Sequence, residues 1–273
     1  MIQSTDRLKE ADHRRVAVFV DQHAGIQLPA QKRNLIETRL RKRQRALGFD
    51  SLTDYIDFAL DLNQNEHVLL IDALTTNKTE FFRERDHFDV LVEYVRHQIP
   101  RTITREKPLD CWSAGCSSGQ EPYTIAMVLR HMLLEDFLIW ATDISVSVLE
   151  RARKAVYPHR EADAISLDYR KKYLLRSKDK PSDLIKMSSD IRRHVQFSEF
   201  NLVSGNFRSL RPFDVIFCRN VMIYFDSRQR HKIIRQFHSV LRPGGLLFIG
   251  HSETITADLF GFRQLVPTVY VKQ

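Results

Sequence analysis

The spacing of apolar residues divides the chain into two regions of different character. From Asp12 to about Thr75, apolar positions recur with helical spacing and no convincing strand is present. A turn is expected at HAGIQLPA, and a second break at LGFDS, where Gly48 interrupts the pattern and Ser51 can cap the following helix. This first region is predicted to be a small all-α domain.

Beyond a connecting segment and a helix that ends near Pro100, short apolar runs alternate with helical stretches. The runs are LDCWSAG, FLIWATD, HVQFSEF, FDVIFCRN, GLLFIGHSE and TVYVKQ, and helices are expected at 121–134, 146–155 and 227–241. This alternation predicts a doubly wound α/β sheet that binds ligands at the carboxyl ends of its strands. Residues 158–193 are charged and serine-rich, break the rhythm and are expected to be an insertion.

Length and composition are those of a soluble globular protein with one large and one smaller domain, at 273 residues, 43% hydrophobic and 28% charged. No apolar run approaches the roughly 18 residues of a membrane span. The N-terminus MIQSTDRLKEADHRR lacks the apolar core of a secretory signal, so we expect a cytoplasmic protein. Cys111, Cys116 and Cys218 lack paired spacing and the histidines lack ligand spacing, so neither a disulfide framework nor a metal site is expected.

The net charge of +8 and the isoelectric point near 9.5 indicate a polyanionic partner, which can be a nucleic acid, a membrane surface or an acidic protein. Residues 31–45, QKRNLIETRLRKRQR, carry seven basic residues against one glutamate. On a helical wheel Ile36, Leu40 and Leu47 share one face, and the basic side chains of Arg41, Lys42 and Arg45 lie roughly opposite. Such a face can bind the partner or can simply be solvated, and the sequence leaves both interpretations open.

The segment CWSAGCSSGQEPYT has the outline of a nucleotide-binding turn. A strand ends at Ala114, Gly115 permits close backbone approach, and the next helix presents free amides. The segment lacks the lysine of a Walker loop and the spacing of a dinucleotide fingerprint. Asp143 ends the next apolar strand, where its carboxylate can accept ribose hydroxyls.

A ribose-binding acid without a phosphate loop favours S-adenosylmethionine as the cofactor. The sulfonium and amino-acid groups of this cofactor need carboxylates and carbonyls, and Glu121 at the junction of loop and helix can supply charge. Glu121 can equally be an ordinary first-turn acid that complements the helix dipole.

Six segments then carry a resemblance over nearly the whole chain. They are LTTNKTEFFRE (74–84), WSAGCSSGQEPYTIAM (112–127), ATDIS (141–145), FNL (200–202), FDVIFCRNVMIYFD (213–226) and LRPGGLLFIGHSE (241–253). In content, order and spacing they resemble the CheR-type chemoreceptor glutamate methyltransferases of bacterial chemotaxis. The resemblance implies an all-α N-terminal domain at 1–75 and a class I, Rossmann-like methyltransferase domain at 76–273. It also implies that the linker 76–85 contributes to the site and that a small β-subdomain is inserted at about 158–196.

The resemblance also assigns the site residues. Those expected to bind S-adenosylmethionine, and its product S-adenosylhomocysteine, are Asn77, Thr79, Arg83, Gly115, Glu121, Asp143, Asn201, Leu202, Arg219 and Asn220. Asn77, Thr79 and Arg83 would lie at the methionine end, and Asn201 and Leu202 would flank the adenine. Arg219, Asn220 and Tyr224 would line the methyl-transfer pocket, and no metal is expected.

The implied reaction converts receptor glutamates into γ-methyl esters. A free glutamate has a pKa of about 4.3 and is already the nucleophile at neutral pH. No general base is required, in line with a sequence that offers no obvious His/Asp or Cys/His dyad. As catalytic residues, Arg83 would hold one carboxylate oxygen and the Tyr224 hydroxyl would orient the other. Arg83 in a surface ion pair with Glu80 or Glu84, and Tyr224 as a core aromatic, remain the alternatives.

The expected partner is the glutamate-rich cytoplasmic helical bundle of methyl-accepting chemotaxis receptors, with Arg41, Lys42 and Arg45 as docking residues. The enzyme is expected to be a monomer, with no nucleic-acid partner and no membrane insertion. Some family members also bind a receptor's C-terminal aromatic peptide through a glycine-rich loop. The corresponding loop here, RSKDKPSDLIKM (176–187), has Pro181 and no glycine, so this tether is not expected.

Two rival functions compete with this one. A nucleic-acid methyltransferase fits the basic charge, but such enzymes usually carry a D/N-P-P-Y/F segment where this chain reads CRNVMIYFD. A non-catalytic module that senses S-adenosylmethionine is disfavoured by the presence of both Arg83 and Tyr224.

Overall fold

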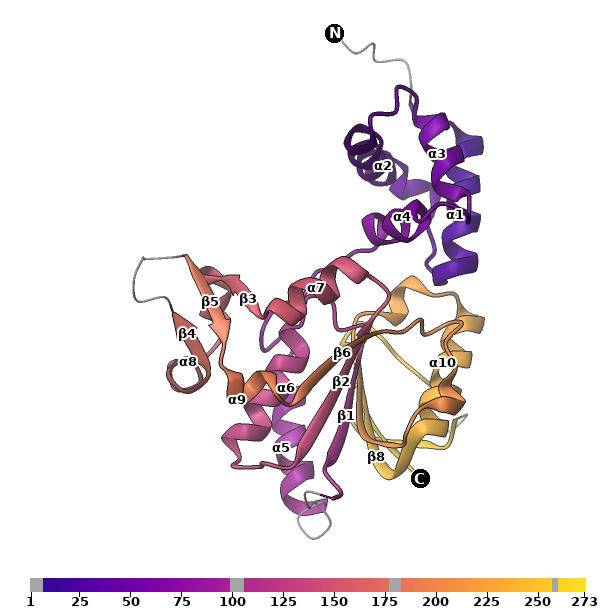
Figure 1. Ribbon diagram of the computed structural model, residues 1–273. Helices are drawn as coiled ribbons and strands as arrows, with labels where there is room; N and C mark the ends of the chain where they lie inside the picture. Colours follow the sequence, from indigo (N-terminus) through magenta and orange to yellow (C-terminus); the bar gives the residue numbers. More distant parts are fainter. Residues whose placement is uncertain (1–6, 99–105, 177–182, 257–259) are drawn as a thin grey trace. The chain divides into compact units, whose positions relative to one another are not determined.

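The computed structural model describes residues 7–98, 106–176, 183–256 and 260–273, and the chain divides into two units (Figure 1). The first unit is Met1–Thr76 together with Tyr224–Gln229, and the second is Asn77–Ile223 together with Arg230–Gln273. The short segment Tyr224–Gln229 therefore belongs with the N-terminal helices although it lies far from them in sequence.

The first unit is all-α, as predicted. Its helices are α1 (Glu10–Ala24), α2 (Arg33–Leu47), α3 (Leu52–Leu60) and α4 (Glu66–Leu74). Ser51 caps α3 as expected, because its hydroxyl oxygen accepts the amides of Thr53 and Asp54 at 3.1 and 3.3 Å. Gly48, with φ of +76°, ends α2 in the left-handed conformation.

A buried carboxylate crosslinks the helices of this unit. Glu66 on α4 accepts two hydrogen bonds from Arg43 on α2, at 2.9 and 2.7 Å, and one from the Tyr55 hydroxyl of α3 at 3.1 Å. Arg43, one of the seven basic residues of 31–45, is thus engaged by Glu66 within this unit. Leu47, expected on the buried face, is 44% exposed. Gln44 is buried in its place, because its amide donates to the carbonyls of Phe49 and Asp50 beyond the helix end.

The second unit is built on a seven-stranded sheet with the order β6-β2-β1-β7-β8-β10-β9. The strands are β1 (Leu109–Ala114), β2 (Phe137–Asp143), β6 (Val195–Glu199), β7 (Phe213–Cys218), β8 (Leu241–Ile249), β9 (Phe262–Val266) and β10 (Val269–Lys272). The first five strands of this order run parallel, and β10 and β9 are antiparallel. The chain builds outward from β1 through β2 and β6, then returns to place β7 on the other side of β1. The strand order therefore reverses between β1 and β7, which is where doubly wound sheets bind ligands.

Helices cover both faces of this sheet. They are α5 (Asp86–Gln98), α6 (Gln120–His131), α7 (Val146–Lys154) and α10 (Ser227–Val240), with α5 and α6 on one side and α10 on the other (Figure 1). Trp112 of β1 is fully buried on the α10 side, with its ring 5.3 Å from that of Phe237. Helix α6 ends at His131, earlier than expected, because Leu133 has a φ of +64° and the Leu134 amide donates back to the Leu129 carbonyl.

The predicted insertion contains a small antiparallel sheet of order β3-β5-β4, formed by β3 (Val156–Pro158), β4 (Leu174–Arg176) and β5 (Leu184–Met187). Helix α8 (Leu167–Tyr173) lies between β3 and β4 in sequence, and α9 (Ser189–Arg192) follows β5. Short 3-10 turns occur at Ala30–Lys32, His159–Ala164, Phe207–Ser209 and Met222–Tyr224. Pro181 lies outside the described residues, so the expectation of a stiff loop that binds no peptide tether stays a prediction.

The structure agrees with the composition-based expectations for cysteine. Cys111, Cys116 and Cys218 are all buried and unpaired. In the described parts of the chain, no helix is both long and apolar enough to cross a membrane.

Candidate active site

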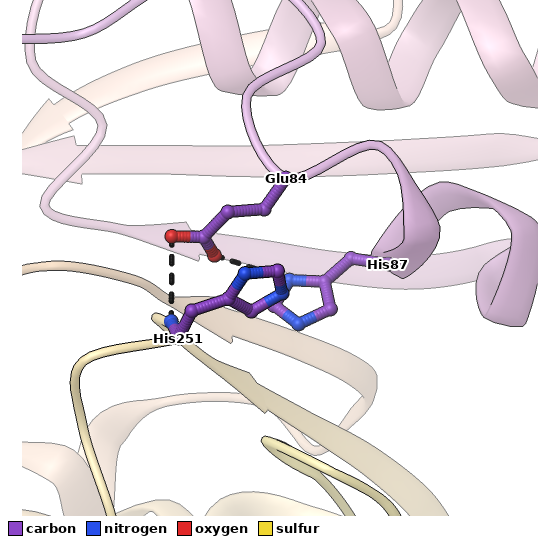
Figure 2. Close-up of side chains that lie close together, drawn as sticks. All are labelled: Glu84, His87 and His251. Atoms are coloured by element: carbon purple, nitrogen blue, oxygen red, sulfur yellow. Dashed lines mark hydrogen bonds and ion pairs between the residues drawn. The ribbon is translucent and has the colours of Figure 1, made fainter.

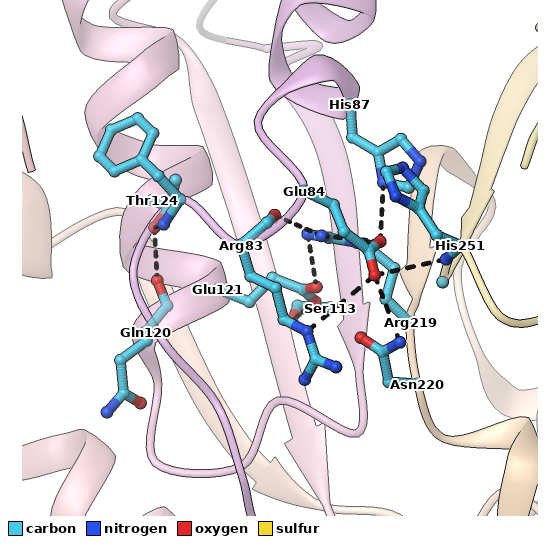
Figure 3. Close-up of polar contacts among 12 residues, drawn as sticks. Arg83, Glu84, His87, Ser113, Gln120, Glu121, Thr124, Arg219, Asn220 and His251 are labelled. Atoms are coloured by element: carbon cyan, nitrogen blue, oxygen red, sulfur yellow. Dashed lines mark hydrogen bonds and ion pairs between the residues drawn. The ribbon is translucent and has the colours of Figure 1, made fainter. Parts of the chain in front are cut away.

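The residues predicted to bind the cofactor follow the strands at the reversal point. Gly115 follows β1, Asp143 ends β2, and Arg219 and Asn220 follow β7. Figure 3 shows the polar contacts that join the last two to the segment before α5 and to the start of α6.

The turn after β1 requires glycine. Gly115 has a φ of +78°, and a Cβ atom there would lie 2.5 Å from Val221 Cγ2. The amides of Gly115 and Cys116 both donate to the Thr142 carbonyl at the end of β2, at 2.7 and 2.8 Å. The turn is thereby held against the neighbouring strand, and α6 begins four residues after Cys116.

Asp143 holds the same turn through the amide of Ser117. Its Oδ2 atom accepts the Ser117 amide at 2.8 Å and its Oδ1 atom accepts the Ser145 amide at 3.0 Å, and the residue is 7% exposed. A carboxylate can accept about four hydrogen bonds, so these two amides alone do not exclude ribose hydroxyls. The Ser117 hydroxyl also donates to the Asn77 carbonyl at 3.2 Å, which ties the linker to the glycine turn.

Glu121 points inward and is held by two donors. The Ser113 hydroxyl donates to Oε1 at 2.7 Å and Arg219 Nη1 donates to Oε2 at 3.3 Å. The Glu121 side chain is 13% exposed. Burial raises the pKa of its carboxyl above the ordinary value, and the Arg219 charge opposes that shift only in part. A carboxylate turned into the sheet edge in this way does more than complement the helix dipole.

Arg219 is the central cation of the site. Its side chain is 2% exposed and contacts Glu84 as well as Glu121, with Nε and Nη2 donating to Glu84 Oε2 at 3.3 and 3.1 Å. Nη2 also donates to the Arg83 carbonyl. The guanidinium lies 5.5 Å from the centre of the Phe88 ring. One buried guanidinium therefore serves two carboxylates and one carbonyl.

The sequence interpretation missed Glu84, although it directly follows Arg83. Glu84 Oε1 accepts the side-chain amide of Asn220 and the backbone amide of His251, both at 3.3 Å (Figure 3). Burial alone would raise the pKa of this carboxyl, but Arg219 and these hydrogen bonds outweigh burial and bring the pKa below its ordinary value. Glu84 is thus held as a carboxylate.

The backbone explains why the pattern did not reveal this residue. Phe82 and Glu84 both have left-handed φ angles, of +54° and +53°, which breaks any helical or strand periodicity across the segment. The turn is anchored by the Phe82 amide, which donates to the Thr124 hydroxyl at 3.2 Å. The side chain of Glu84 consequently faces the site interior, where it is 12% exposed, and that of Arg83 is 33% exposed.

Arg83 itself is only loosely held. Its Nη1 donates to the Lys78 carbonyl at 3.2 Å, and its Nε lies 4.0 Å from Glu84 Oε1. The alternative interpretation of Arg83, an ion pair with Glu84, is therefore present in the structure, but the two side chains are far apart for an ion pair. Thr79 in the same linker is half-buried.

A second missed carboxylate, Glu253, holds the other side of Asn220. Its Oε2 atom accepts the amides of Asn220 and Gly250 at 2.9 and 2.7 Å, and the residue is 7% exposed. A Cβ atom on Gly250 would lie 2.4 Å from Asn220 Nδ2, so the glycine leaves room for that amide group. Both missed acids occur inside quoted motifs, FFRE and GHSE, beside residues that were singled out.

Asn201 and Leu202 lie just beyond β6. The Asn201 side-chain oxygen accepts the amides of Val203 and Ser204 at 2.8 and 3.3 Å, and Leu202 is 6% exposed. Asn201 therefore shapes its own turn.

Tyr224 belongs to the all-α unit. Its carbonyl accepts the Gln27 amide at 2.9 Å, and the Lys32 ammonium lies 5.8 Å from its ring centre. The two residues expected to be catalytic thus fall in different units, Arg83 in the second and Tyr224 in the first.

The expected docking residues Arg41, Lys42 and Arg45 line a surface depression on α2. Arg41 is partly neutralised by Glu37 at 2.9 Å, whereas Lys42 and Arg45 are exposed.

Three potential metal ligands also meet here, although their sequence spacing gave no indication of it. Glu84, His87 and His251 offer ligand atoms that all lie within 4.8 Å of one another (Figure 2). Both Glu84 oxygens already accept hydrogen bonds, and a cation would have to displace the Arg219 guanidinium. His87 Nε2 is hydrogen-bonded to the Thr268 hydroxyl at 2.8 Å. We therefore assign this cluster to the ion-pair network.

Comparison with known proteins gives matches over both units. Residues 77–270 match the family described as CheR methyltransferase, SAM binding domain, and residues 11–75 match CheR methyltransferase, all-alpha domain. The chain is 39% identical over 277 residues to the chemotaxis protein methyltransferase of Salmonella typhimurium, covering 99% of this chain and 93% of the relative. It is 38% identical over 266 residues to the chemotaxis protein methyltransferase of Borreliella burgdorferi, covering 94% and 93%. It is also 37% identical over 249 residues to chemotaxis protein methyltransferase 2 of Pseudomonas aeruginosa, covering 90% and 87%.

Proposed function

The chain belongs to the CheR methyltransferase family, and we propose from this that it is an S-adenosylmethionine-dependent protein-glutamate O-methyltransferase that methylates chemotaxis receptors. The observation that carries the proposal is the match to both family domains, reinforced by relatives named as chemotaxis protein methyltransferases over nearly the full chain. The product is a glutamate γ-methyl ester, and the spent cofactor is S-adenosylhomocysteine.

The chain's own residues need only bind and orient in this reaction. The cofactor supplies an electrophilic methyl group on a sulfonium, and the receptor supplies a carboxylate that is ionised at neutral pH. The histidines beside Arg219 support this view. His87 is buried and hydrogen-bonded to Thr268, and burial together with the Arg219 charge lowers its pKa to about 4. His251 contacts Asp86 at 3.1 Å. Neither is needed as a base.

Arg83 is our candidate for holding the substrate carboxylate. Its guanidinium is one-third exposed, with a single hydrogen bond to a carbonyl and a long approach to Glu84, so it can exchange partners at low cost. Tyr224 is proposed to orient the second carboxylate oxygen. A well-oriented intramolecular arrangement can lower a barrier by up to about 7–11 kcal/mol, which makes orientation sufficient without acid–base help.

The cofactor would be held by the residues around the glycine turn and the two flanking segments. We assign the ribose to Asp143, the adenine side to Asn201 and Leu202, and the methionine end to Asn77, Thr79 and Arg83. Gly115 and Glu121 would hold the cofactor on the side of the glycine turn, and Arg219 and Asn220 would line the methyl-transfer pocket with Tyr224. The amide contacts of Asp143 and the buried donors around Glu121 support this assignment, because they preorganise acceptors for hydroxyl and ammonium groups.

The all-α domain, residues 1–75, is proposed to dock the glutamate-rich helical bundle of the receptor through Arg41, Lys42 and Arg45. The enzyme would act in the cytoplasm as a monomer.

The decisive experiment incubates the full-length chain with methyl-labelled S-adenosylmethionine and membranes containing chemoreceptors. Label in the receptor that is released as methanol by base identifies a methyl ester. Base-resistant label in added nucleic acid would favour the nucleic-acid methyltransferase, and base-resistant label in the receptor would contradict the methyl ester. Binding without any transfer would indicate the sensing module.

A further inference from the structure

We propose that the inserted subdomain is a working part of the S-adenosylmethionine site, and that Tyr157 of β3 is a positioning residue through which it holds the glycine turn. Tyr157 and the turn both belong to the second unit. The inference deepens the proposed function, because it gives the insertion a role in cofactor binding. It rests on the use of this cofactor and not on the identity of the methyl acceptor.

The turn between β1 and α6 needs support because two of its residues are left-handed. Ser117 has a φ of +49° and Gly119 has a φ of +94°. A non-glycine residue keeps such a conformation only where its surroundings fix it. Strand β2 supports the first half of the turn, through the Thr142 carbonyl and the Asp143 carboxylate. The second half needs another support.

The insertion supplies it through Tyr157, which is 1% exposed. Strand β3, where the insertion begins, directly follows α7 (Figure 1). The Tyr157 hydroxyl donates to the Ser118 carbonyl at 2.8 Å. Four residues after Ser118 stands Pro122, which has no amide to offer this carbonyl in the first turn of α6. The approach is close, because a Cβ atom on Gly119 would lie 3.0 Å from the Tyr157 hydroxyl. The hydroxyl therefore takes the place of a missing helical donor.

A second contact from the insertion ends at the same residue of the turn. Glu161, in the 3-10 turn His159–Ala164, accepts the side-chain amide of Gln120 at 2.9 Å. Gln120 begins α6 and is 2% exposed, and its Oε1 atom accepts the Ser118 hydroxyl at 2.8 Å. Ser118 is thus held from the insertion at its carbonyl directly and at its hydroxyl through Gln120.

The insertion also contacts the linker 76–85, the other segment expected to bind the cofactor. The rings of Phe81 and Tyr157 meet edge to face, with their centres 5.1 Å apart. Arg85 Nη2 donates to the Ala164 carbonyl at 2.6 Å. Tyr157 therefore contacts both segments on which the cofactor would rest, and it acts through them.

Removal of one hydroxyl tests this role. Tyr157→Phe keeps the ring and its contact with Phe81 but takes the hydrogen bond from the buried Ser118 carbonyl. We expect the dissociation constant of S-adenosylmethionine to rise about tenfold, because the turn no longer starts in its binding shape. Calorimetry on the full-length chain without receptor measures this constant. A failure to methylate receptors would thus contradict the proposed function without affecting this result.

Turnover with receptor separates positioning from chemistry. The KM for S-adenosylmethionine should rise in Tyr157→Phe, whereas kcat at saturating cofactor should stay within about threefold of wild type, since the hydroxyl takes no part in methyl transfer. A loss confined to kcat would contradict the assigned role.

Tyr123→Phe is the matched control. The Tyr123 hydroxyl also donates to a buried backbone carbonyl, that of Ala152 in α7, at 2.9 Å, and Tyr123 is likewise 1% exposed. Urea unfolding should show similar losses of stability in the two variants, but the control should bind the cofactor within about twofold of wild type. Equal weakening of binding in both variants would show a merely structural role and overturn the proposal, as would unchanged binding in Tyr157→Phe.

Discussion

Asp143, our candidate for binding the ribose, is also a structural tie. Its position at the end of β2 followed from an apolar run closed by an acid. The contact with the Ser117 amide, which holds the glycine turn, could not be foreseen, because it depends on the left-handed Ser117, with φ of +49°. Sequence located the residue, and only the backbone path revealed its second role.

Replacing Asp143 by Ala should abolish measurable cofactor binding. The change removes the expected ribose acceptor and also leaves the Ser117 and Ser145 amides unpaired, at roughly 1–3 kcal/mol each. Calorimetry with S-adenosylmethionine measures the effect, and Asp86→Ala, at an exposed position, serves as the control. Unchanged affinity would remove Asp143 from the site.

His87 should make the protein less stable in mild acid. Its folded pKa is about 4 and its unfolded value is 6.5, because burial and Arg219 disfavour the charged ring. The unfolded state therefore binds the proton first, and stability present above pH 6.5 is lost as pH falls from 6.5 toward 4. The loss attributable to this residue is at most about 3 kcal/mol.

Urea unfolding of wild type and His87→Gln across this range isolates that contribution. Gln can replace the hydrogen bond to Thr268 but does not titrate, so the difference in unfolding free energy between the two proteins should shrink toward pH 4. A constant difference would mean that His87 does not titrate as described.

At the level of elements, the basic residues of helix α2 have two different roles: some make structural contacts and others are exposed. Arg43 donates to the Glu66 carboxylate, and Arg39 donates to the carbonyls of Leu74 and Thr75 at the end of α4. These contacts leave Lys42 and Arg45 as the exposed cations among the expected docking residues. The wheel predicted the buried pair of Ile36 and Leu40, but it could not separate structural arginines from available ones.

Reversing Arg41 and Arg45 to Glu should slow receptor methylation mainly through weaker association. The rate should fall about tenfold at low salt, and its dependence on ionic strength should flatten, because screened attraction is what the charges supply. Reversing Arg228 and Arg230, which are exposed near the start of α10, is the matched control. If rate and salt dependence both stay at the wild-type level, the α2 face is only solvated surface.

Strands were predictable where an apolar run was closed by a turn and much less so elsewhere. The runs of β1, β2 and β7 are buried along almost their whole length, so they stand out from the surrounding polar sequence. Strand β9 was not expected, because Phe262 is buried and its other four residues are exposed, as befits an edge. The missed acids Glu84 and Glu253 share one cause, since both follow irregular backbone with no period to reveal their direction.

For the whole molecule, the count of 42 lysines and arginines overstates the number of cations available to a polyanion. Arg219 is buried in the site, Arg43 is ion-paired with Glu66 in the all-α unit, and Arg242 bridges Asp214 and Asp110 at 2.6 and 3.3 Å. A basic composition therefore supports an acidic partner only after the internally paired arginines are discounted.

The all-α unit is assembled from two separate stretches of sequence, and this constrains how such proteins can recombine. Tyr224–Gln229 packs with the N-terminal helices through the Gln27 amide and through Gln229, whose side chain donates to Asp21 at 3.2 Å. A chimaera that takes only residues 1–76 from a distant relative would contain that relative's first stretch without the 224–229 segment that packs against it. We expect it to unfold at a lower temperature than one that also imports 224–229, and thermal denaturation of both would reveal the difference. During evolution the two stretches should therefore change together. A substitution in one stretch should be tolerated only with a matching substitution in the other.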